Sequence, residues 1–122
     1  MAQLFIVEDN ELVAQYLQKS LKEEFDVQVF SSAEPCIDKL QSGQVPDYLL
    51  IDHFLPGNLN GLDLFKEASK KMPTGRLIML TENAGVDFFE EMADNNVDHY
   101  VQKFGDYVKK IRQIIAEEAK SA

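Results

Sequence analysis

The sequence has little cysteine and no long apolar run. Cys36 is the single cysteine, which rules out an intrachain disulfide, and no cluster of cysteine and histidine surrounds it, which excludes a zinc site. We therefore expect Cys36 to be a small buried apolar side chain. No apolar segment approaches the length that spans a bilayer, and no basic stretch precedes an apolar run at the N-terminus. These absences predict a soluble, cytoplasmic protein that does not act at a membrane.

Basic residues are also scarce, since 12 lysines and arginines face 21 acidic residues, for a formal net charge of −9. Such a surface repels a phosphate backbone, so direct binding to nucleic acid is not expected, whereas acidic groups brought together would attract a divalent cation. The chain has only six glycines and four prolines, which leaves little room for disorder. Its length predicts a single domain over residues 1–122, with no output domain in this chain.

Five short apolar runs have the length of strands. None alternates strictly between apolar and polar residues, which is typical of strands buried on both faces of a parallel sheet. The runs cover residues 4–7, 27–30, 48–51, 77–80 and 100–101.

Helical patterns follow these runs, with apolar residues at spacings of three and four. Asn10 is the expected cap of the first helix, and Ser31 and Glu34 have the spacing of a capping box ahead of a helix over residues 33–41. Phe88 and Ile114 lie beside the predicted stripes and either widen the buried face or contact a partner. The stripes of the other helices are Val13, Leu17, Leu21 and Phe25; Leu62, Phe65, Ala68 and Met72; Phe89, Met92, Ala93 and Val97; and Phe104, Val108, Ile111 and Ile115.

Five strands alternating with five helices predict an α/β fold, a doubly wound five-stranded parallel sheet with right-handed crossovers and helices on both faces. In such sheets, ligands bind beyond the carboxyl ends of the strands, where the strand order reverses. The residues that follow the apolar runs are therefore the candidates for a functional site.

Four of the five predicted strands end on polar groups: Glu8 and Asp9 after the first, Asp52 after the third, Thr81 after the fourth and Lys103 after the fifth. If the strand order is 2-1-3-4-5, Asp52 lies centrally, with Asp9 and Thr81 each one strand away at about 4.8 Å. Lys103 is roughly 10 Å away at the backbone, and its long side chain can span much of that gap. We expect these side chains to converge.

Converging carboxylates need a cation, because two charges about 4 Å apart repel by roughly 4 kcal/mol at an effective dielectric of 20. Mg²⁺ fits, since it accepts one or two carboxylates and keeps waters that phosphate can replace. Carboxylates, a lysine, a hydroxyl and Mg²⁺ together suit phosphoryl transfer. Asp52 would be the nucleophile and would form an aspartyl-phosphate.

Each of these residues also has a plainer interpretation. An acidic pair ahead of a helix favours the positive end of the helix dipole, and an aspartate suits a turn. Thr81 can be an ordinary strand residue and Lys103 a solvated charge. Taken one at a time, the plainer interpretations are preferred. Polar groups at the ends of four adjacent strands favour a common site instead.

Four segments closely resemble the receiver domain of two-component response regulators: LFIVEDN, YLLIDHFLPG with NGLDLF, LIMLT, and VDHYVQK. The resemblance covers essentially the whole chain. It implies a flavodoxin-like (βα)5 fold with strand order 2-1-3-4-5. It also implies a signalling phosphoprotein of a phosphorelay rather than an enzyme acting on a separate substrate.

Carried over residue by residue, the resemblance implies that Asp52 accepts a phosphoryl group from a histidine kinase or phosphotransfer protein, or from a small phosphodonor. Asp9 and Asp52 would hold Mg²⁺, with Mn²⁺ as a substitute, and Glu8 would help directly or through water. The backbone carbonyl of Phe54 would complete the protein ligands. Lys103 would contact the phosphoryl oxygens.

The resemblance also implies a conformational switch. The hydroxyl of Thr81 would move toward the phosphoryl group, and Tyr100, three residues before the lysine, would swing inward with it. The surface made by the fourth helix, fifth strand and fifth helix would then shift its population and control a downstream protein target or output domain. The chain would be a monomer or a weak phosphorylation-dependent dimer. A plainer interpretation of Tyr100 is a half-buried strand aromatic.

Several positions depart from the usual receiver pattern. Glu8 stands where an aspartate is common, and Phe104 follows the lysine where a proline is usual, so whether the peptide bond before Phe104 is cis stays open. The loop PGNLNG is one residue longer than the commoner form, which should shift the start of the third helix.

The resemblance also implies that three positions tune rates. Phe54 and Asn83 are the second residues after the aspartate and the threonine, and a large apolar Phe54 cannot hold a hydrolytic water, which predicts slow self-dephosphorylation. Glu82 stands where a small residue is usual. It either narrows access to Asp52 and repels anionic donors or is a solvated loop charge.

Two other functions are weighed against the phosphoacceptor. The first is an unphosphorylated pseudo-receiver that acts as a protein-interaction module. The second is a metal-dependent phosphatase, but the two residues after Asp52 are His53 and Phe54, so the paired aspartates of one large phosphatase class are missing. The sequence names neither the cognate kinase nor the output target.

Overall fold

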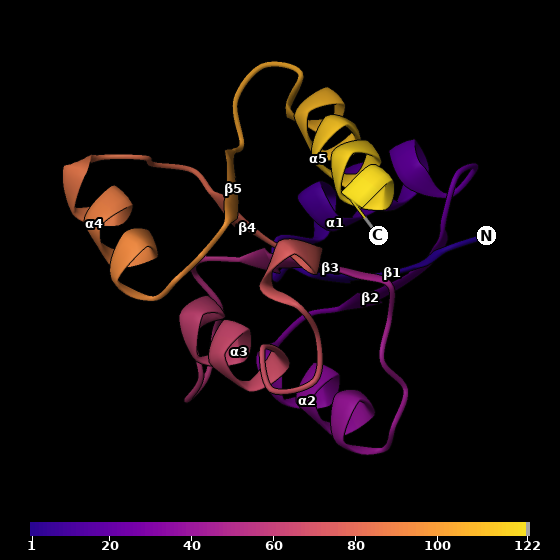
Figure 1. Cartoon of the computed structure of the whole chain (residues 1–122), viewed down its shortest axis with the longest axis horizontal. Coiled ribbons are helices and arrows are strands. Elements are labelled where there is room, and N and C mark those ends of the chain that lie inside the picture. The colour runs from indigo at the N-terminus through magenta and orange to yellow at the C-terminus, as the bar shows by residue number, and fades with distance from the viewer. Residues whose placement is uncertain (122) are drawn as a thin grey trace.

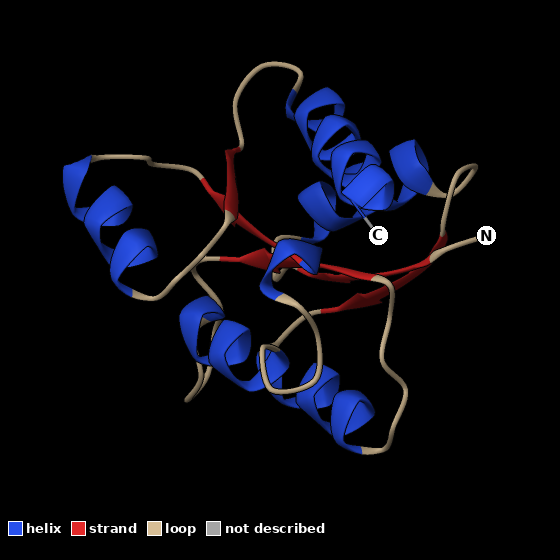
Figure 2. Cartoon of the chain, in the orientation of Figure 1, coloured by secondary structure: helices blue, strands red, loops and turns tan. Residues whose placement is uncertain are grey.

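The computed structural model describes residues 1–121 and contains five strands that alternate with five α-helices (Figures 1 and 2). A short 3-10 turn, η1 (Thr74–Arg76), precedes the fourth strand. No helix among these residues has both the length and the apolar character needed to cross a membrane. The elements are β1 (Gln3–Val7), α1 (Glu11–Leu21), β2 (Asp26–Phe30), α2 (Ala33–Gln41), β3 (Tyr48–Asp52), α3 (Gly61–Ala68), β4 (Leu77–Thr81), α4 (Val86–Asp94), β5 (His99–Gln102) and α5 (Tyr107–Ser121).

All five strands are parallel, in the order β2-β1-β3-β4-β5. The predicted doubly wound sheet and its strand order are confirmed. Strand order reverses between β1 and β3, so the carboxyl end of β3 lies beside the switch point at which such sheets bind ligands.

The two faces of the sheet bury separate apolar clusters, which explains why the strands lack a polar face. Leu4 and Ile6 of β1 point to the side covered by α1 and α5, whereas Phe5 and Val7 point to the side covered by α2, α3 and α4. Figure 1 shows the two groups of helices on opposite sides of the sheet. Cys36 is buried in the second cluster, and burial raises the pKa of its thiol to about 12, as expected for a small apolar core residue.

Helix α4 is turned by one residue from its predicted stripe. Phe88 and Met92 are buried, whereas Phe89 is 42% exposed and Ala93 is also exposed. The prediction for Phe89 and Ala93 was wrong because both phenylalanines satisfy the helical spacing to Met92, at three and four residues. Only the position of the helix on the sheet selects between them. Phe88 therefore belongs to the buried face of the helix, in agreement with the first of its two interpretations.

The last helix begins later than predicted. Phe104 lies in the loop before α5 and is 74% exposed, so its assignment to the helix stripe was wrong. Gly105, at φ +61°, turns the chain ahead of the helix. Val108, Ile111 and Ile115 are buried as expected, and Ile114 packs partly buried against them. All peptide bonds between described residues are trans, including the one before Phe104.

The helix caps agree with the sequence only in part. The Asn10 side chain accepts hydrogen bonds from the amides of Leu12 and Val13, as expected of a cap. The predicted capping box at Ser31 is wrong, because the N-cap of α2 is Ser32 and its side chain makes no capping bond. Instead, α3 carries a capping box that the sequence analysis missed. The residues of that box are Asn60 and Asp63, with both hydrogen bonds at 2.9 Å.

Candidate functional site

The backbone ladder extends one residue beyond several strands and so fixes the residues at their carboxyl ends. The amide of Glu8 donates to the carbonyl of Phe30 at 3.0 Å, and the amide of Lys103 donates to the carbonyl of Thr81 at 2.7 Å. Asp52 is the last residue of β3 and is paired in register with Leu80. The side chains that follow the strands are therefore held by the sheet rather than by free loops.

Three carboxylates meet at this edge. Glu8, Asp9 and Asp52 each offer an oxygen, and these oxygens lie within 4.8 Å of one another. Glu8 and Asp52 are buried, at 2% and 5% exposure, whereas Asp9 is exposed. One oxygen of Glu8 accepts from the amide of Asn10, and one oxygen of Asp52 accepts from the amide of Phe54, both at 3.2 Å. The predicted acidic cluster is present.

The ammonium of Lys103 reaches into this cluster. Its nitrogen lies 2.7 Å from Glu8 Oε2 and 3.2 Å from Asp52 Oδ1, and all three side chains are at least nine-tenths buried. Burial acts to lower the pKa of the ammonium, but the two carboxylates outweigh burial and raise the pKa above its ordinary value. The ammonium of Lys103 is therefore positively charged at neutral pH, and from the end of β5 it reaches the carboxylates at the ends of β1 and β3.

The electrostatics of Asp52 are set by burial and by its acidic neighbour. Burial first, and then the charge of Glu8, raise the pKa of Asp52 to about 7, against the opposing influence of Lys103. One ammonium among three carboxylates leaves an excess of negative charge. A further cation that joined this site would lower the pKa of Asp52 and favour its ionised form.

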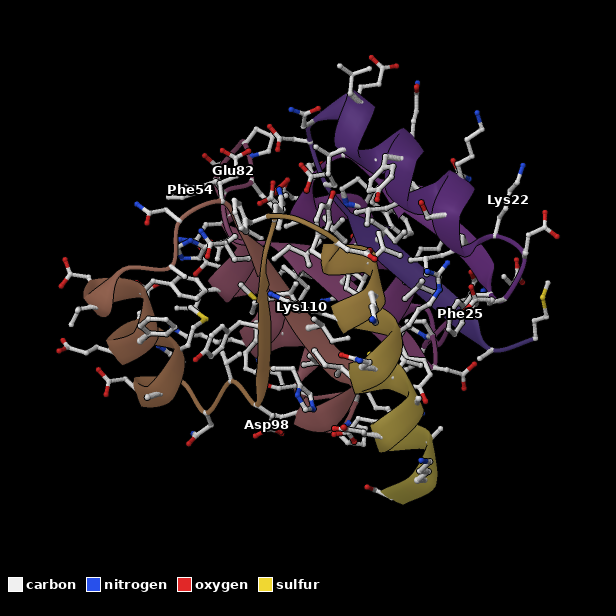
Figure 3. All side chains as sticks on the ribbon, turned by 90° about the horizontal axis from the view of Figure 1, so that it is seen from above. Lys22, Phe25, Phe54, Glu82, Asp98 and Lys110 are labelled. Atoms are coloured by element: carbon white, nitrogen blue, oxygen red, sulfur yellow. The ribbon has the colours of Figure 1, made fainter. Side chains whose placement is uncertain are left out.

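The donor set fits a hard divalent cation. Its protein donors are oxygens, it has net negative charge, and Glu8 Oε2 is buried with only an ionic contact to Lys103 and no directed hydrogen bond. The three acids line a hollow of about 320 Å³ together with Asn10, Phe54 and Glu82. A larger hollow of about 600 Å³ lies between α1 and β2 near Lys22 and Phe25, on another part of the surface (Figure 3). Within the described residues, no second cluster of three potential metal ligands is found.

Thr81 and Tyr100 lie near the site, but their polar groups do not reach the carboxylates. Thr81 is fully buried; its hydroxyl donates to the carbonyl of Asn83 at 2.9 Å and accepts from the amide of Asn83 at 3.2 Å. Tyr100 is 40% exposed, with its ring against Phe88 and Phe89. The plainer interpretation of Tyr100 as a half-buried aromatic describes this arrangement.

Phe54 and Glu82 stand at the mouth of the hollow, side by side in Figure 3. The ring of Phe54 is 69% exposed, and Glu82 and Asn83 are exposed as well. The carbonyl of Glu82 accepts from the side-chain amide of Gln102 at 3.2 Å, which ties this loop to the end of β5. These residues therefore frame the entrance to Asp52 rather than contacting its carboxylate with their side chains.

Two residues of the site were not anticipated from the sequence. Gly61 begins α3 against the acceptor strand, where a Cβ would overlap the carbonyl oxygen of Asp52 and lie 2.9 Å from the Cα of His53. His53 lies between the rings of Phe54 and Phe88 and contacts Glu91 of α4 at 2.8 Å. The NG pair of the loop was a usable signal for Gly61, but no spacing connects His53 with Glu91.

Solved receiver structures match this fold over nearly its whole length. A CheY-like response regulator receiver domain protein from Methanospirillum hungatei JF-1 is 23% identical with a TM-score of 0.84, covering 100% of this chain and 99% of that one. The receiver domain of a modulated diguanylate cyclase from Desulfovibrio desulfuricans G20 is 25% identical with a TM-score of 0.81, covering 96% and 92%. A DNA-binding response regulator of the LuxR family from Staphylococcus aureus is 24% identical with a TM-score of 0.79, covering 96% and 98%.

A search of curated proteins finds no match. The family model described as response regulator receiver domain, however, matches residues 4–116. This range includes all five strands except the first residue of β1, and it includes the whole acidic cluster. The chain therefore belongs to the response regulator receiver domain family.

Proposed function

We propose that this receiver domain is a phosphoacceptor of a two-component system and that Asp52 takes the phosphoryl group. The observation that carries the proposal is the buried Asp52 carboxylate at the end of the central strand, 3.2 Å from the ammonium of Lys103 and beside Glu8 and Asp9. An oxygen of Asp52 would form a bond to phosphorus as the bond from phosphorus to the imidazole nitrogen of a phosphohistidine breaks. The donor's histidine leaves with the bonding electron pair.

The residues of the cluster divide this work. Lys103 would offset the charge of the phosphoryl oxygens, because its ammonium is already held against Asp52. Glu8, Asp9, Asp52 and the backbone carbonyl of Phe54 would hold Mg²⁺, or Mn²⁺ in its place. The metal supplies charge neutralisation at the phosphoryl oxygens when it is bound.

The switch that follows involves Thr81 and Tyr100. The Thr81 hydroxyl would exchange its partner in Asn83 for a phosphoryl oxygen, and the Tyr100 ring would turn inward from its half-exposed position. The surface of α4, β5 and α5 would shift with them and control a protein partner. The Staphylococcus aureus relative carries DNA-binding in its name, which supports an output domain as one such partner. This single domain, a cytoplasmic monomer or weak phosphorylation-dependent dimer, would not itself bind nucleic acid or act on a separate substrate.

The residues at the mouth of the hollow would set the rates. Phe54 would slow hydrolysis of the aspartyl-phosphate because its ring cannot position a water, and Asn83, the second residue after Thr81, would also affect the rate. Glu82 would disfavour small anionic donors by repulsion at the entrance. Phe54→Asn is expected to lose phosphate faster, and Glu82→Ala to label faster from acetyl phosphate, both with the same Mg²⁺. Rates equal to those of the parent protein would reject these two roles.

The test is intact-mass measurement after incubation with acetyl phosphate and Mg²⁺. The parent chain should gain one phosphoryl group, whereas Asp52→Asn should gain none. Asp98→Asn, which alters an acid at the other end of the sheet, should gain one group, as the parent does. Absence of the adduct in the parent, with Mg²⁺ shown to bind, would favour the alternative of a pseudo-receiver that acts only as an interaction module.

A further inference from the structure

The side chain of His53 joins the acceptor strand to α4. His53 directly follows Asp52, and its Nε2 lies 2.8 Å from Oε1 of Glu91. The ring also meets the edge of Phe88, with centroids 5.0 Å apart and planes at 83°. Phe88 and Glu91 are three residues apart and so lie on one face of α4. A single side chain next to the acceptor thus contacts two successive turns of that helix.

Phe88 passes this contact on to Tyr100. The two ring centroids lie 5.5 Å apart, and Phe89 closes the group at 5.4 Å from Tyr100. Phe88 is only 7% exposed, so its ring has little room to move without its neighbours. The contacts therefore run without interruption from His53, through Phe88, to the half-exposed Tyr100.

We propose that His53 is a positioning residue that holds α4, and through it Tyr100, in the arrangement of this structure, in which the Tyr100 ring is half-exposed and is called outward below. The proposal rests on the proposed phosphorylation of Asp52 and the inward turn of Tyr100. Tyr100 can turn inward only if its ring contacts with Phe88 and Phe89 change, because those rings pack against it. A shift of α4 that changes them also strains the contacts of His53 with Phe88 and Glu91.

The consequence is a linkage between His53 and the ligand of Asp52. A contact made only in the outward arrangement shifts the conformational equilibrium toward that arrangement. It therefore lowers the affinity of the acceptor site for any group that favours the inward arrangement, by the same factor. Removing that contact should raise the affinity of the acceptor site, and it should turn Tyr100 partly inward without any ligand. Neither effect requires His53 to contact the phosphoryl group.

The test uses beryllofluoride with Mg²⁺ as the probe on the whole chain. Affinity is measured by titration, and the Tyr100 ring resonances are followed by NMR, with assignment from Tyr100→Phe. His53→Ala should bind beryllofluoride at least about fivefold more tightly than the parent. Its ligand-free Tyr100 resonances should move toward the bound position of the parent. Glu91→Gln, at a half-exposed position, should change both readouts in the same direction by a smaller factor.

The chain offers a matched control in a second histidine–glutamate pair. The nitrogen of His99 and the oxygen of Glu118 are 2.7 Å apart, and this pair joins the start of β5 to α5. Its side chains are 22% and 25% exposed, against 18% and 46% in the first pair. His99→Ala should leave the beryllofluoride affinity as in the parent. His53→Phe keeps the contacts with the neighbouring rings, and His53→Gln keeps a polar contact with Glu91. Each should therefore bring the beryllofluoride affinity part of the way back to that of the parent.

Two results would overturn the proposal separately. If the parent binds beryllofluoride and His53→Ala binds it equally or more weakly, His53 does not hold the outward arrangement, while the phosphoacceptor function stands. If the parent binds no beryllofluoride in the presence of bound Mg²⁺, both the phosphoacceptor function and the role of His53 are wrong.

Discussion

The two ends of the sheet handle their acidic residues differently. At the amino end, three carboxylates have a donor of their own: Asp47 accepts from the amide of Gln3 at 2.7 Å, Asp98 from the hydroxyl of Thr74 at 2.6 Å, and Glu118 pairs with His99 at 2.7 Å. At the carboxyl end, Glu8, Asp9 and Asp52 gather around the single ammonium of Lys103. Figure 3 places Asp98 far from the entrance residues Phe54 and Glu82.

The two ends differ in charge balance. At the amino end these acids have individual donors, whereas at the carboxyl end the acids outnumber the cation that contacts them. Partly exposed acids with individual donors add modestly to stability and need no ligand. Buried acids in excess of their cations oppose folding unless a further cation offsets their charge. The raised pKa of Asp52, about 7, reports this imbalance at the carboxyl end. Four experiments separate the two ends.

The largest effect should follow from removing the one cation of the carboxyl end. Lys103→Ala leaves two buried carboxylates unpaired, so we expect the free energy of unfolding to fall by about 3 to 5 kcal/mol at pH 8 with a chelator present. The matched change at the amino end, His99→Ala, should cost about 1 kcal/mol or less, because that pair is partly exposed. Urea unfolding of both variants measures the two losses of stability. Equal losses would contradict the expected difference between the two ends.

A pair of glycines tests how tightly each end is packed. Gly61→Ala would push a Cβ into the backbone of the acceptor strand, at a cost of about 3 kcal/mol. Gly75→Ala at the amino end would meet only the carboxylate of Glu118, at 2.6 Å, which is the far end of a flexible side chain. We expect less than about 1 kcal/mol there. Thermal unfolding of the two variants measures both losses of stability. A larger loss of stability in Gly75→Ala than in Gly61→Ala would show that the backbone of the acceptor strand can shift to accommodate a Cβ.

The raised pKa of Asp52 makes stability depend on pH. Because its pKa is about 7 in the folded chain against an ordinary value of 3.8, the folded state binds more protons between these values. The free energy of unfolding therefore falls as pH rises through this window when no metal is present. Asp52→Asn should remove this slope and be more stable than the parent at pH 8 by about 2 kcal/mol.

Asp98→Asn is the control for this effect, since its acid already has a donor in Thr74. Urea unfolding from pH 4 to 8 in a chelator measures all three slopes. A parental slope in Asp52→Asn would mean that another group carries the pH dependence.

The smallest effect is the stabilisation by metal. Mg²⁺ at ten times its dissociation constant should raise the free energy of unfolding by about 1.4 kcal/mol. Asp9→Asn should need more Mg²⁺ for the same rise in Tm, whereas Asp38→Asn on the exposed side of α2 should behave as the parent. A parental response of Asp9→Asn would remove Asp9 from the metal site.

Prediction from the sequence was strongest where the pattern is local and repeated. The apolar runs located all five strands to within one residue at each end, and the strand order implied by the family resemblance is confirmed. Prediction failed where two residues fit the same helical periodicity. Phe88 and Phe89 both lie at a helical spacing from Met92, but only Phe88 is buried. It also failed at Phe104, because a single positive φ at Gly105 ends the preceding segment before the helix begins.

The candidate site was predictable in its members but not in its contacts. That Glu8, Asp52 and Lys103 converge follows from strand ends meeting at one edge of a parallel sheet. That Lys103 lies closer to Glu8 than to Asp52, at 2.7 against 3.2 Å, depends on side-chain conformations that no spacing encodes. The roles of the site residues stay predictions for the experiments above.

The sequence by itself determined the doubly wound sheet and the position of Asp52 at the end of its central strand, because apolar periodicity and strand ends are local properties of the chain. Only the tertiary structure decided which acid pairs with Lys103, how far burial raises the pKa of Asp52, and that His53 contacts α4. These features depend on distances between segments far apart in the sequence. Such distances exist only after the register, the twist and the packing of the elements are set.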